Sequence, residues 1–449
     1  MKKSLVSLIT LAAAQCLLAG TLTFECSTDK KSGVYKVNEK IIFTATLKED
    51  GKTPEDKDIH YTLFHGSKKI KKGKVPAKDG LKIETSVERP DWARLEVRAS
   101  GADGKFICQK NRKGKNAVFT GLAGAIVSPR EIKPFTEEPA DFDQFWLDAK
   151  KELAAVPLKV REMKALPGRK GIRIFDVKIS CAGEKPVSGI LCIPEGIAPK
   201  SVPALVNFHG AGVRSAKAII EHAMLGAITF DVNAHGIENG KPKKFYADLR
   251  KNYYYKTHDK HRQNDYYTWY KHDPQKYYMR GMFLRVLRAL EYVKTLPEWD
   301  GKHLAISGTS QGGTQSIVAA ALDKDVTFLR AGVPGWCDIS GVLTDRMGGG
   351  GDVYTKKEAE ETPALVKNLS YFDCMFFARR IKCPTYINTG LIDVRCYPSG
   401  VFAAYNQIPA ATKKYIQVSP KGGHSAFHAK GHKALKEYIK KVTSKGKAK

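Results

Sequence analysis

The stretch "ISGTSQGGTQSIVAAAL", residues 306–322, decides the fold of the larger part of this chain. It contains a G-x-S-x-G string that runs from Gly308 to Gly312. A strand-like apolar run, "HLAIS", precedes the string, and a helix-like run of small and apolar residues follows it. This order predicts a tight strand-to-helix turn that exposes the hydroxyl of Ser310 above a sheet. The alternative is a helix N-terminus that Thr309 or Ser310 merely caps.

Strand-like and helix-like segments alternate on both sides of this turn. The strand-like runs are "VPALVNFHG", "AITFDVN", "CPTYINTG" and "KKYIQVS". Helices are expected after "SPREIKPFTEEP", at about 278–295, directly after Ser310, and at about 425–442. Continuous apolar runs such as "ALVNF" are typical of strands buried on both faces. The pattern predicts a mostly parallel sheet flanked by helices, with the chemistry at the carboxyl ends of its strands.

Residues 21–125 have a different, two-residue periodicity. "IIFTATL" places Phe43, Ala45 and Leu47 on one face, and "ARLEVRAS" alternates in the same way. Turn-rich breaks such as "KEDGKTPEDKD" separate these runs. We therefore expect a small antiparallel β-sandwich, immunoglobulin-like in arrangement, in front of the larger unit.

The first 20 residues have the layout of a secretory signal peptide. Two lysines precede an apolar stretch from Leu5 to Ala19, which is too short to favour a stable membrane span. This predicts a secreted or periplasmic protein. A lipoprotein anchored through Cys16 is the alternative, but Gln15 stands where lipid attachment usually requires a small residue.

Composition excludes several classes of function. The 449 residues include 75 Lys and Arg against 46 Asp and Glu, a formal charge of +29 that could attract an acidic glycan or surface. The basic residues are scattered and no recognition motif accompanies them, so no nucleic-acid partner is expected. Of the nine cysteines, Cys26 and Cys108 could pair after export or stay free, and no spacing predicts a metal site.

A serine nucleophile needs a neutral imidazole to remove its proton and a carboxylate to orient that imidazole. In this kind of fold the order along the chain is Ser, Asp, His. Asp393, in "NTGLIDVRCYPS", lies in the loop after one predicted strand. His424, in "VSPKGGHSAFH", lies after the next strand and just before the last helix. We therefore predict that Ser310, Asp393 and His424 are the catalytic residues.

Each of these roles has a competitor. Asp338, in "PGWCDIS", also follows a strand-like segment and could supply the acid instead of Asp393. His428 and His432 lie one and two helical turns beyond His424, where surface or packing roles are more usual.

An ester hydrolase also needs donors for the oxyanion of the tetrahedral intermediate. The amide of Gln311, directly after the nucleophile, is one expected donor. Ala211, in "NFHGAG", is the expected second donor, because Gly210 and Gly212 allow its N–H to turn inward. A glycine turn without a chemical role is the alternative.

Several strings together resemble the acetyl xylan esterase and cephalosporin-C deacetylase family of α/β-hydrolases, carbohydrate esterase family seven. These are "PADFDQFW", "NFHGAG", "YYMRGMFLRVLRALEYVKTLPEWDG", "SGTSQGG", "GLIDVRCYPS" and "GGH". The resemblance implies an α/β-hydrolase fold over about residues 130–443 and the removal of acetyl groups from short acetylated xylo-oligosaccharides through an acetyl-serine intermediate. It implies no metal or other cofactor, a possible homo-oligomer, and Ser310, Asp393 and His424 as the triad. Met282 and Ser425 stand where the family has Gln and Glu.

Two other classes of function remain open at the level of the sequence. A serine peptidase would share the fold, and a non-catalytic glycan-binding protein could keep a hydrolase shell. The residues that bind the substrate are not identified. The aromatic-rich segment 252–278 would suit stacking on sugar rings, but equally a lid or a subunit contact.

Overall fold

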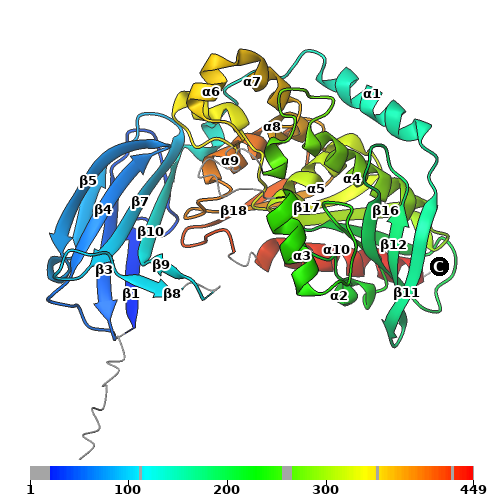
Figure 1. Ribbon diagram of the computed structural model, residues 1–449, viewed down its shortest axis with the longest axis horizontal. Coiled ribbons are helices and arrows are strands. Elements are labelled where there is room, and N and C mark those ends of the chain that lie inside the picture. Colours follow the sequence, from blue (N-terminus) through cyan, green and yellow to red (C-terminus); the bar gives the residue numbers. More distant parts are fainter. Residues whose placement is uncertain (1–20, 111–113, 255–264, 350–352, 426–428, 448–449) are drawn as a thin grey trace, which may run out of the picture.

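The structure is a computed structural model that describes residues 21–110, 114–254, 265–349, 353–425 and 429–447 (Figure 1). The expected leader, residues 1–20, lies outside these ranges, so the prediction of export stays a prediction. None of the helices within the described ranges combines the length and the apolar character needed to cross a bilayer.

The first described part is a sandwich of two sheets. One sheet has the strand order β1-β3-β6 and the other β2-β10-β7-β4-β5, and β8 and β9 form a separate two-stranded sheet. All of these pairs are antiparallel except β2 with β10. The strands are β1 (Leu22–Thr28), β2 (Val34–Tyr35), β3 (Ile41–Glu49), β4 (Asp58–His65), β5 (Lys68–Pro76), β6 (Leu81–Thr85), β7 (Asp91–Ser100), β8 (Cys108–Lys110), β9 (Asn116–Val118) and β10 (Thr120–Val127). The predicted alternation is confirmed, since Phe43, Ala45 and Leu47 are all buried in the core between the two sheets.

The second part contains a nine-stranded sheet in the order β11-β12-β13-β15-β14-β16-β17-β18-β19. Strands β15, β14 and β16 to β19 are parallel, and an antiparallel run of β11, β12 and β13 extends one edge. The strands are β11 (Val160–Arg169), β12 (Ile172–Ile179), β13 (Val187–Pro194), β14 (Val202–Phe208), β15 (Ile228–Val232), β16 (Trp299–Thr309), β17 (Val326–Gly332), β18 (Thr385–Gly390) and β19 (Lys414–Ser419). The expected mostly parallel sheet is confirmed for its central strands.

Helices cover both faces of this sheet, as Figure 1 shows. Alternate residues of the central strands explain why: Val206 and Ile306 pack in one cluster with α5, whereas Leu205 and Ala305 pack in another with α10. The helices are α1 (Phe142–Ala155), α2 (Ile220–Ala223), α3 (Lys243–Leu249), α4 (Tyr278–Thr295), α5 (Gln311–Leu322), α6 (Lys356–Glu361), α7 (Pro363–Ser370), α8 (Cys374–Ala378), α9 (Pro398–Gln407) and α10 (Ala429–Lys447).

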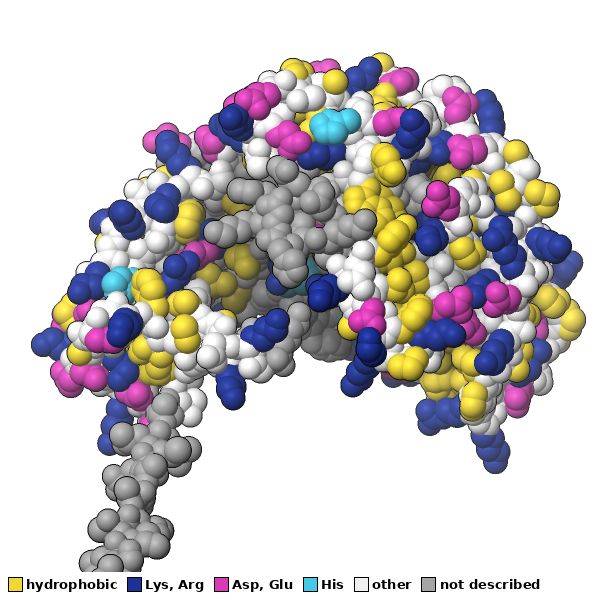
Figure 2. Space-filling view, in the orientation of Figure 1, with side chains coloured by type: hydrophobic (Ala, Val, Ile, Leu, Met, Phe, Trp, Pro, Cys, Tyr) yellow, Lys and Arg dark blue, Asp and Glu magenta, His cyan; other side chains and the backbone are white. Residues whose placement is uncertain are grey.

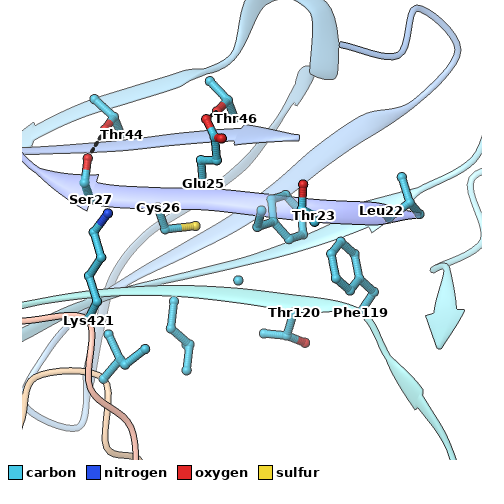
Figure 3. Close-up of a pocket in the computed structure, with 14 residues that line it drawn as sticks. Leu22, Thr23, Glu25, Cys26, Ser27, Thr44, Thr46, Phe119, Thr120 and Lys421 are labelled. Carbon is cyan, nitrogen blue, oxygen red and sulfur yellow. Dashed lines mark hydrogen bonds between the residues drawn. The ribbon is translucent and has the colours of Figure 1, made fainter. Parts of the chain in front are cut away.

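The sandwich lies against the loops that follow β18 and β19, and the surface is hollowed between the two parts (Figure 2). A groove of about 770 Å³ runs along β1 and the start of β10, and Ile392 and Lys421 of the second part close its other side (Figure 3). These two residues belong to the loops that carry Asp393 and His424. The sandwich therefore contacts the loops in which the predicted acid and base lie.

The described cysteines are all free thiols. Cys26 is half-buried and Cys108 is exposed, and they are not bonded to each other. The possibility of a disulfide between them is therefore wrong, and the alternative of free thiols is the one observed.

Candidate active site

Ser310 lies between β16 and α5 on a strained turn. Its φ of 62° and ψ of −127° fall in a region that residues with a side chain rarely adopt. A Cβ added to Gly308 would lie 2.1 Å from the carbonyl oxygen of Gly312, and one added to Gly312 would lie 2.0 Å from that of Phe208. Only glycine fits at these two positions, so the G-x-S-x-G string is required by the close approach of the backbone.

Three side chains from three loops meet at this turn. The Oγ atom of Ser310 lies 3.0 Å from Nε2 of His424, and Nδ1 of His424 lies 3.0 Å from Oδ2 of Asp393. The other carboxylate oxygen of Asp393 accepts hydrogen bonds from the backbone N–H groups of Arg395 (2.8 Å) and Cys396 (3.0 Å). Because a carboxylate only accepts, Nδ1 of His424 carries the proton and Nε2 is left to accept from the serine hydroxyl.

The structure gives Asp338 other surroundings. Asp338 is buried and its Oδ2 lies 3.2 Å from Nε of Arg346. Burial raises the pKa of Asp338 to about 6, although the charge of Arg346 opposes that change. His432 lies half-buried on α10, and His428 lies outside the described residues.

Both expected oxyanion donors lie beside Ser310. Gln311 is the first residue of α5, so its N–H has no helical carbonyl one turn before it. On the other side, a Cβ added to Gly210 would lie 3.5 Å from Cβ of Ser310, which brings the loop that contains Ala211 against the nucleophile. Gly212, directly after Ala211, has a φ of +127°. That the Gln311 and Ala211 amides face a common oxygen stays a prediction.

Sequence reasoning missed two residues that hold these donors. His209 is buried, its Nε2 accepts the N–H of Ala234 (3.1 Å) and its Nδ1 lies 2.7 Å from the carbonyl oxygen of Gly210. Burial lowers the pKa of His209 to about 4, so the ring is neutral and Nδ1–H donates to that carbonyl. The hydroxyl of Tyr266 donates to the side-chain oxygen of Gln311. The His that precedes Gly-x-Gly was a visible signal for the first residue, but no spacing pointed to Tyr266.

A buried guanidinium lies under the turn that carries Ser310. Nη1 of Arg330, on β17, lies 3.1 Å from Oγ1 of Thr309 and 3.3 Å from the carbonyl oxygen of Gly308. Burial lowers the pKa of Arg330 to about 10, which still leaves it charged at neutral pH. Its hydrogen bonds tie the end of β16 to β17. The sequence analysis attached no role to Arg330, which lies in the strand "VTFLRAG" without a recognised motif around it.

Several tyrosines of the aromatic-rich segment are interior. Tyr254, Tyr266 and Tyr277 are at most 1% exposed, and Tyr254 stacks on Trp269 at 5.9 Å between ring centroids. These buried tyrosines are not available to stack on a sugar or to contact a subunit, and the role of the rest of the segment, as a lid or otherwise, stays a prediction. Tyr270 is 67% exposed. Residues 255–264 of the segment lie outside the described residues.

The two departures from the family strings have different surroundings. Met282 is fully buried on α4 among other apolar side chains, whereas Ser425 is exposed beside His424. Within the described ranges, no three His, Cys, Asp or Glu side chains come together as a metal ion would require.

Comparison with known proteins finds a matching family profile and a curated relative. The profile of the family described as "Acetyl xylan esterase (AXE1)" matches residues 128–442. Acetyl esterase Axe7A of Xylanibacter ruminicola is 30% identical over 352 residues, which cover 77% of this chain and 74% of that protein.

Two solved structures are similar in fold. An acetyl xylan esterase from Paenibacillus sp. R4 is 25% identical, with a TM-score of 0.58, over 70% of this chain and 98% of that one. Acetyl xylan esterase 1 from Thermoanaerobacterium sp. JW/SL YS485 is 24% identical, with a TM-score of 0.56, over 70% of this chain and 97% of that one. The residues matched by the family profile, 128–442, include Ser310, Asp393 and His424, and the chain belongs to the acetyl xylan esterase family.

Proposed function

We propose that this protein is a serine esterase that removes acetyl groups from acetylated carbohydrates of the xylo-oligosaccharide kind. The observation that carries the proposal is the hydrogen-bonded series Ser310–His424–Asp393, with the serine on a strained turn at the carboxyl edge of the sheet. Membership of the acetyl xylan esterase family supports the choice of an acetyl ester as substrate.

In the first half of the reaction, Nε2 of His424 takes the proton of Ser310 as Oγ bonds to the acetyl carbonyl carbon. The amides of Gln311 and Ala211 stabilise the negative oxygen that forms. When the intermediate collapses, His424 returns the proton to the sugar oxygen, which leaves as a hydroxyl. The acetyl group stays on Ser310.

In the second half, a water molecule replaces the sugar. His424 removes a proton from the water as its oxygen attacks the acetyl carbon, and Ser310 leaves with that proton while acetate is released. Asp393 accepts from Nδ1–H throughout, so it keeps the imidazole oriented and stabilises its charged form. These steps consume one water and release one acetic acid per ester, which ionises to acetate and a proton.

The test is Ser310→Ala, which only shortens one side chain. Release of acetate from acetylated xylo-oligosaccharides should fall by about four orders of magnitude or more, because the nucleophile is lost. Circular dichroism should show an unchanged fold, and Ser444→Ala, at an exposed serine on α10, should keep full activity. Near-normal turnover by pure Ser310→Ala would refute the proposal. Cleavage of peptides in preference to acetyl esters would instead favour a serine peptidase.

The location of the protein is a second part of the proposal. We propose that residues 1–20 direct export and that the mature chain begins close to Thr21. Amino-terminal sequencing of the protein recovered from its source cells tests this, since a retained Met1 would contradict it.

A further inference from the structure

Two residues of the sandwich belong to the core of the other part of the molecule. Trp92, on β7, and Ile126, its register partner on β10, are fully buried among residues of the α/β part. Their neighbours Ala93 and Ala125 point the other way, into the core of the sandwich. Because successive residues of a strand face opposite sides, the same two strands contribute to both cores. The sandwich is therefore packed into the α/β part rather than joined to it by a tether alone.

The contact is centred on Leu391. Nε1 of Trp92 donates a hydrogen bond of 2.9 Å to the carbonyl oxygen of Leu391, and both residues are fully buried. A Cβ added to Gly124 would lie 1.9 Å from that same oxygen, and one added to Gly33 would lie 2.5 Å from Cδ1 of Leu391. The backbone of Leu391 leaves no room for a side chain at position 124, and Gly33 has a φ of +65° that favours glycine.

Leu391 stands two residues before Asp393. Its N–H also bonds to the carbonyl of Ser419 (3.0 Å), at the end of β19, and the N–H of Ile392 bonds to that of Gly422 (3.1 Å), in the loop after β19. The backbone that leads to Asp393 is therefore clamped between Trp92 and the loop that carries His424. Beyond this clamp, Asp393 is held by Arg395 and Cys396 of its own loop.

We infer that Trp92 is a positioning residue, which acts through the carbonyl of Leu391 to hold the carboxylate of Asp393 against His424. The sandwich then helps to position the catalytic acid, although it supplies no group that touches the substrate. This inference rests on the proposed role of Asp393. It assigns a task to residues that lie before the part of the chain matched by the family profile.

The first test compares two identical chemical changes. Trp92→Phe removes the N–H donor to the carbonyl of Leu391. Trp146→Phe is the control, because Trp146 is also buried and its N–H donates to the carbonyl oxygen of Tyr371 at 3.0 Å. Small displacements of catalytic groups are costly, so Trp92→Phe should lower kcat for nitrophenyl acetate by about tenfold to a hundredfold with little change in KM. Trp146→Phe should lower the thermal midpoint similarly and leave kcat unchanged. Equal kcat values in the two variants would overturn the inference.

The second test asks whether Trp92 acts through Asp393. In an Asp393→Asn background there is no carboxylate left to orient, so adding Trp92→Phe should lower kcat by less than about threefold. Rates are corrected for the residual hydrolysis by Ser310→Ala. If the two losses multiply, Trp92 acts independently of Asp393 and the inference fails. An active Ser310→Ala would instead disprove the proposed function. The failure of the inference on Trp92 and the failure of the proposed function therefore give different results.

Gly124→Ala is the second variant, because its methyl group must push on the same carbonyl oxygen. It should also lower kcat, and that loss should also largely disappear in the Asp393→Asn background. A folded Gly124→Ala with normal kcat would contradict the inference even if Trp92→Phe failed to fold.

Discussion

Two buried aspartates, Asp393 and Asp338, lie in loops that follow the neighbouring strands β18 and β17, yet they have opposite surroundings. Asp393 accepts two backbone N–H groups and one imidazole N–H. Asp338 faces the guanidinium of Arg346, and the buried Asp373 lies next to it. Burial, together with the charge of Asp338, raises the pKa of Asp373 to about 7.

Loop geometry accounts for the difference. Asp393 follows the end of β18 by three residues, so it stays at the carboxyl edge of the sheet beside the loop that follows β19. Asp338 follows the end of β17 by six residues, and the chain turns through left-handed conformations at Trp336 and Asp338. The helical turn η5 (Ile339–Thr344) then leads to Arg346. A carboxylate after a strand is therefore only a candidate acid, and the length and turns of its loop decide what it contacts.

The largest expected effect tests the difference between Asp393 and Asp338 directly. Asp393→Asn should fold normally but lose about 10⁴-fold in kcat, because the amide no longer holds the correct tautomer of His424. Asp338→Asn should change kcat by less than about threefold, since its carboxylate faces Arg346. Acetate release by the two purified variants measures both. A crippled Asp338→Asn beside an active Asp393→Asn would reverse the assignment of the acid and leave Ser310 and His424 in place.

The sequence predicted the parts that local rules determine. The turn at Ser310 could be read from its glycines, and the loop positions of Asp393 and His424 followed from the order of strands and helices. The helix expected at 278–295 is α4 with the same bounds. These features depend on short stretches of chain, so periodicity and motif spacing were enough to find them.

Contacts between distant residues could not be predicted in this way. The hydrogen bond from Tyr266 to Gln311 spans 45 residues, and that from Trp92 to Leu391 spans 299. Nothing in the spacing of Tyr or Trp distinguishes a residue that holds the active site from one that fills the core. The aromatic-rich segment shows the same limit, since its composition suited a surface whereas Tyr254 and Tyr277 are interior.

A smaller effect should appear in stability around Asp338 and leave catalysis unchanged. Arg346→Met removes the positive charge that faces Asp338. The pKa of Asp338 is about 6, so this carboxyl is ionised at pH 8 and mostly protonated at pH 5. Because the pKa of Asp338 is raised from 3.8 to about 6, its ionisation costs stability progressively between these pH values and fully above about pH 6, where the charge of Arg346 offsets part of the cost. The charge of Arg346 also opposes the raised pKa of Asp91, which adds in the same direction.

Arg346→Met should therefore lower the free energy of unfolding by about 3 kcal/mol at pH 8. The loss should be smaller at pH 5, where Asp338 is mostly protonated. There the main loss is the hydrogen bond from Arg346 to the carbonyl of Lys133, which contributes about 1 kcal/mol. Urea unfolding at the two pH values measures this difference. Equal losses at both would show that Asp338 is not ionised at pH 8, and a large fall in kcat of the folded variant would tie this loop to catalysis after all.

The smallest expected effect concerns how each aspartate is held. Asp338 depends on a side chain, whereas Oδ1 of Asp393 depends on backbone N–H groups, one of them from the exposed Arg395. Arg395→Ala keeps that N–H, so kcat should stay within about threefold of the parent. Arg395→Pro has no N–H to donate, and the loss of one hydrogen bond to a charged group should lower kcat by about tenfold. Steady-state kinetics of the two variants, with circular dichroism to show that the fold is kept, measures the difference.

Equal kcat values in Arg395→Ala and Arg395→Pro would mean that the remaining N–H of Cys396 and the clamp on Leu391 hold Asp393 without Arg395. A large loss in Arg395→Ala would mean that the side chain, not the backbone, orients the acid.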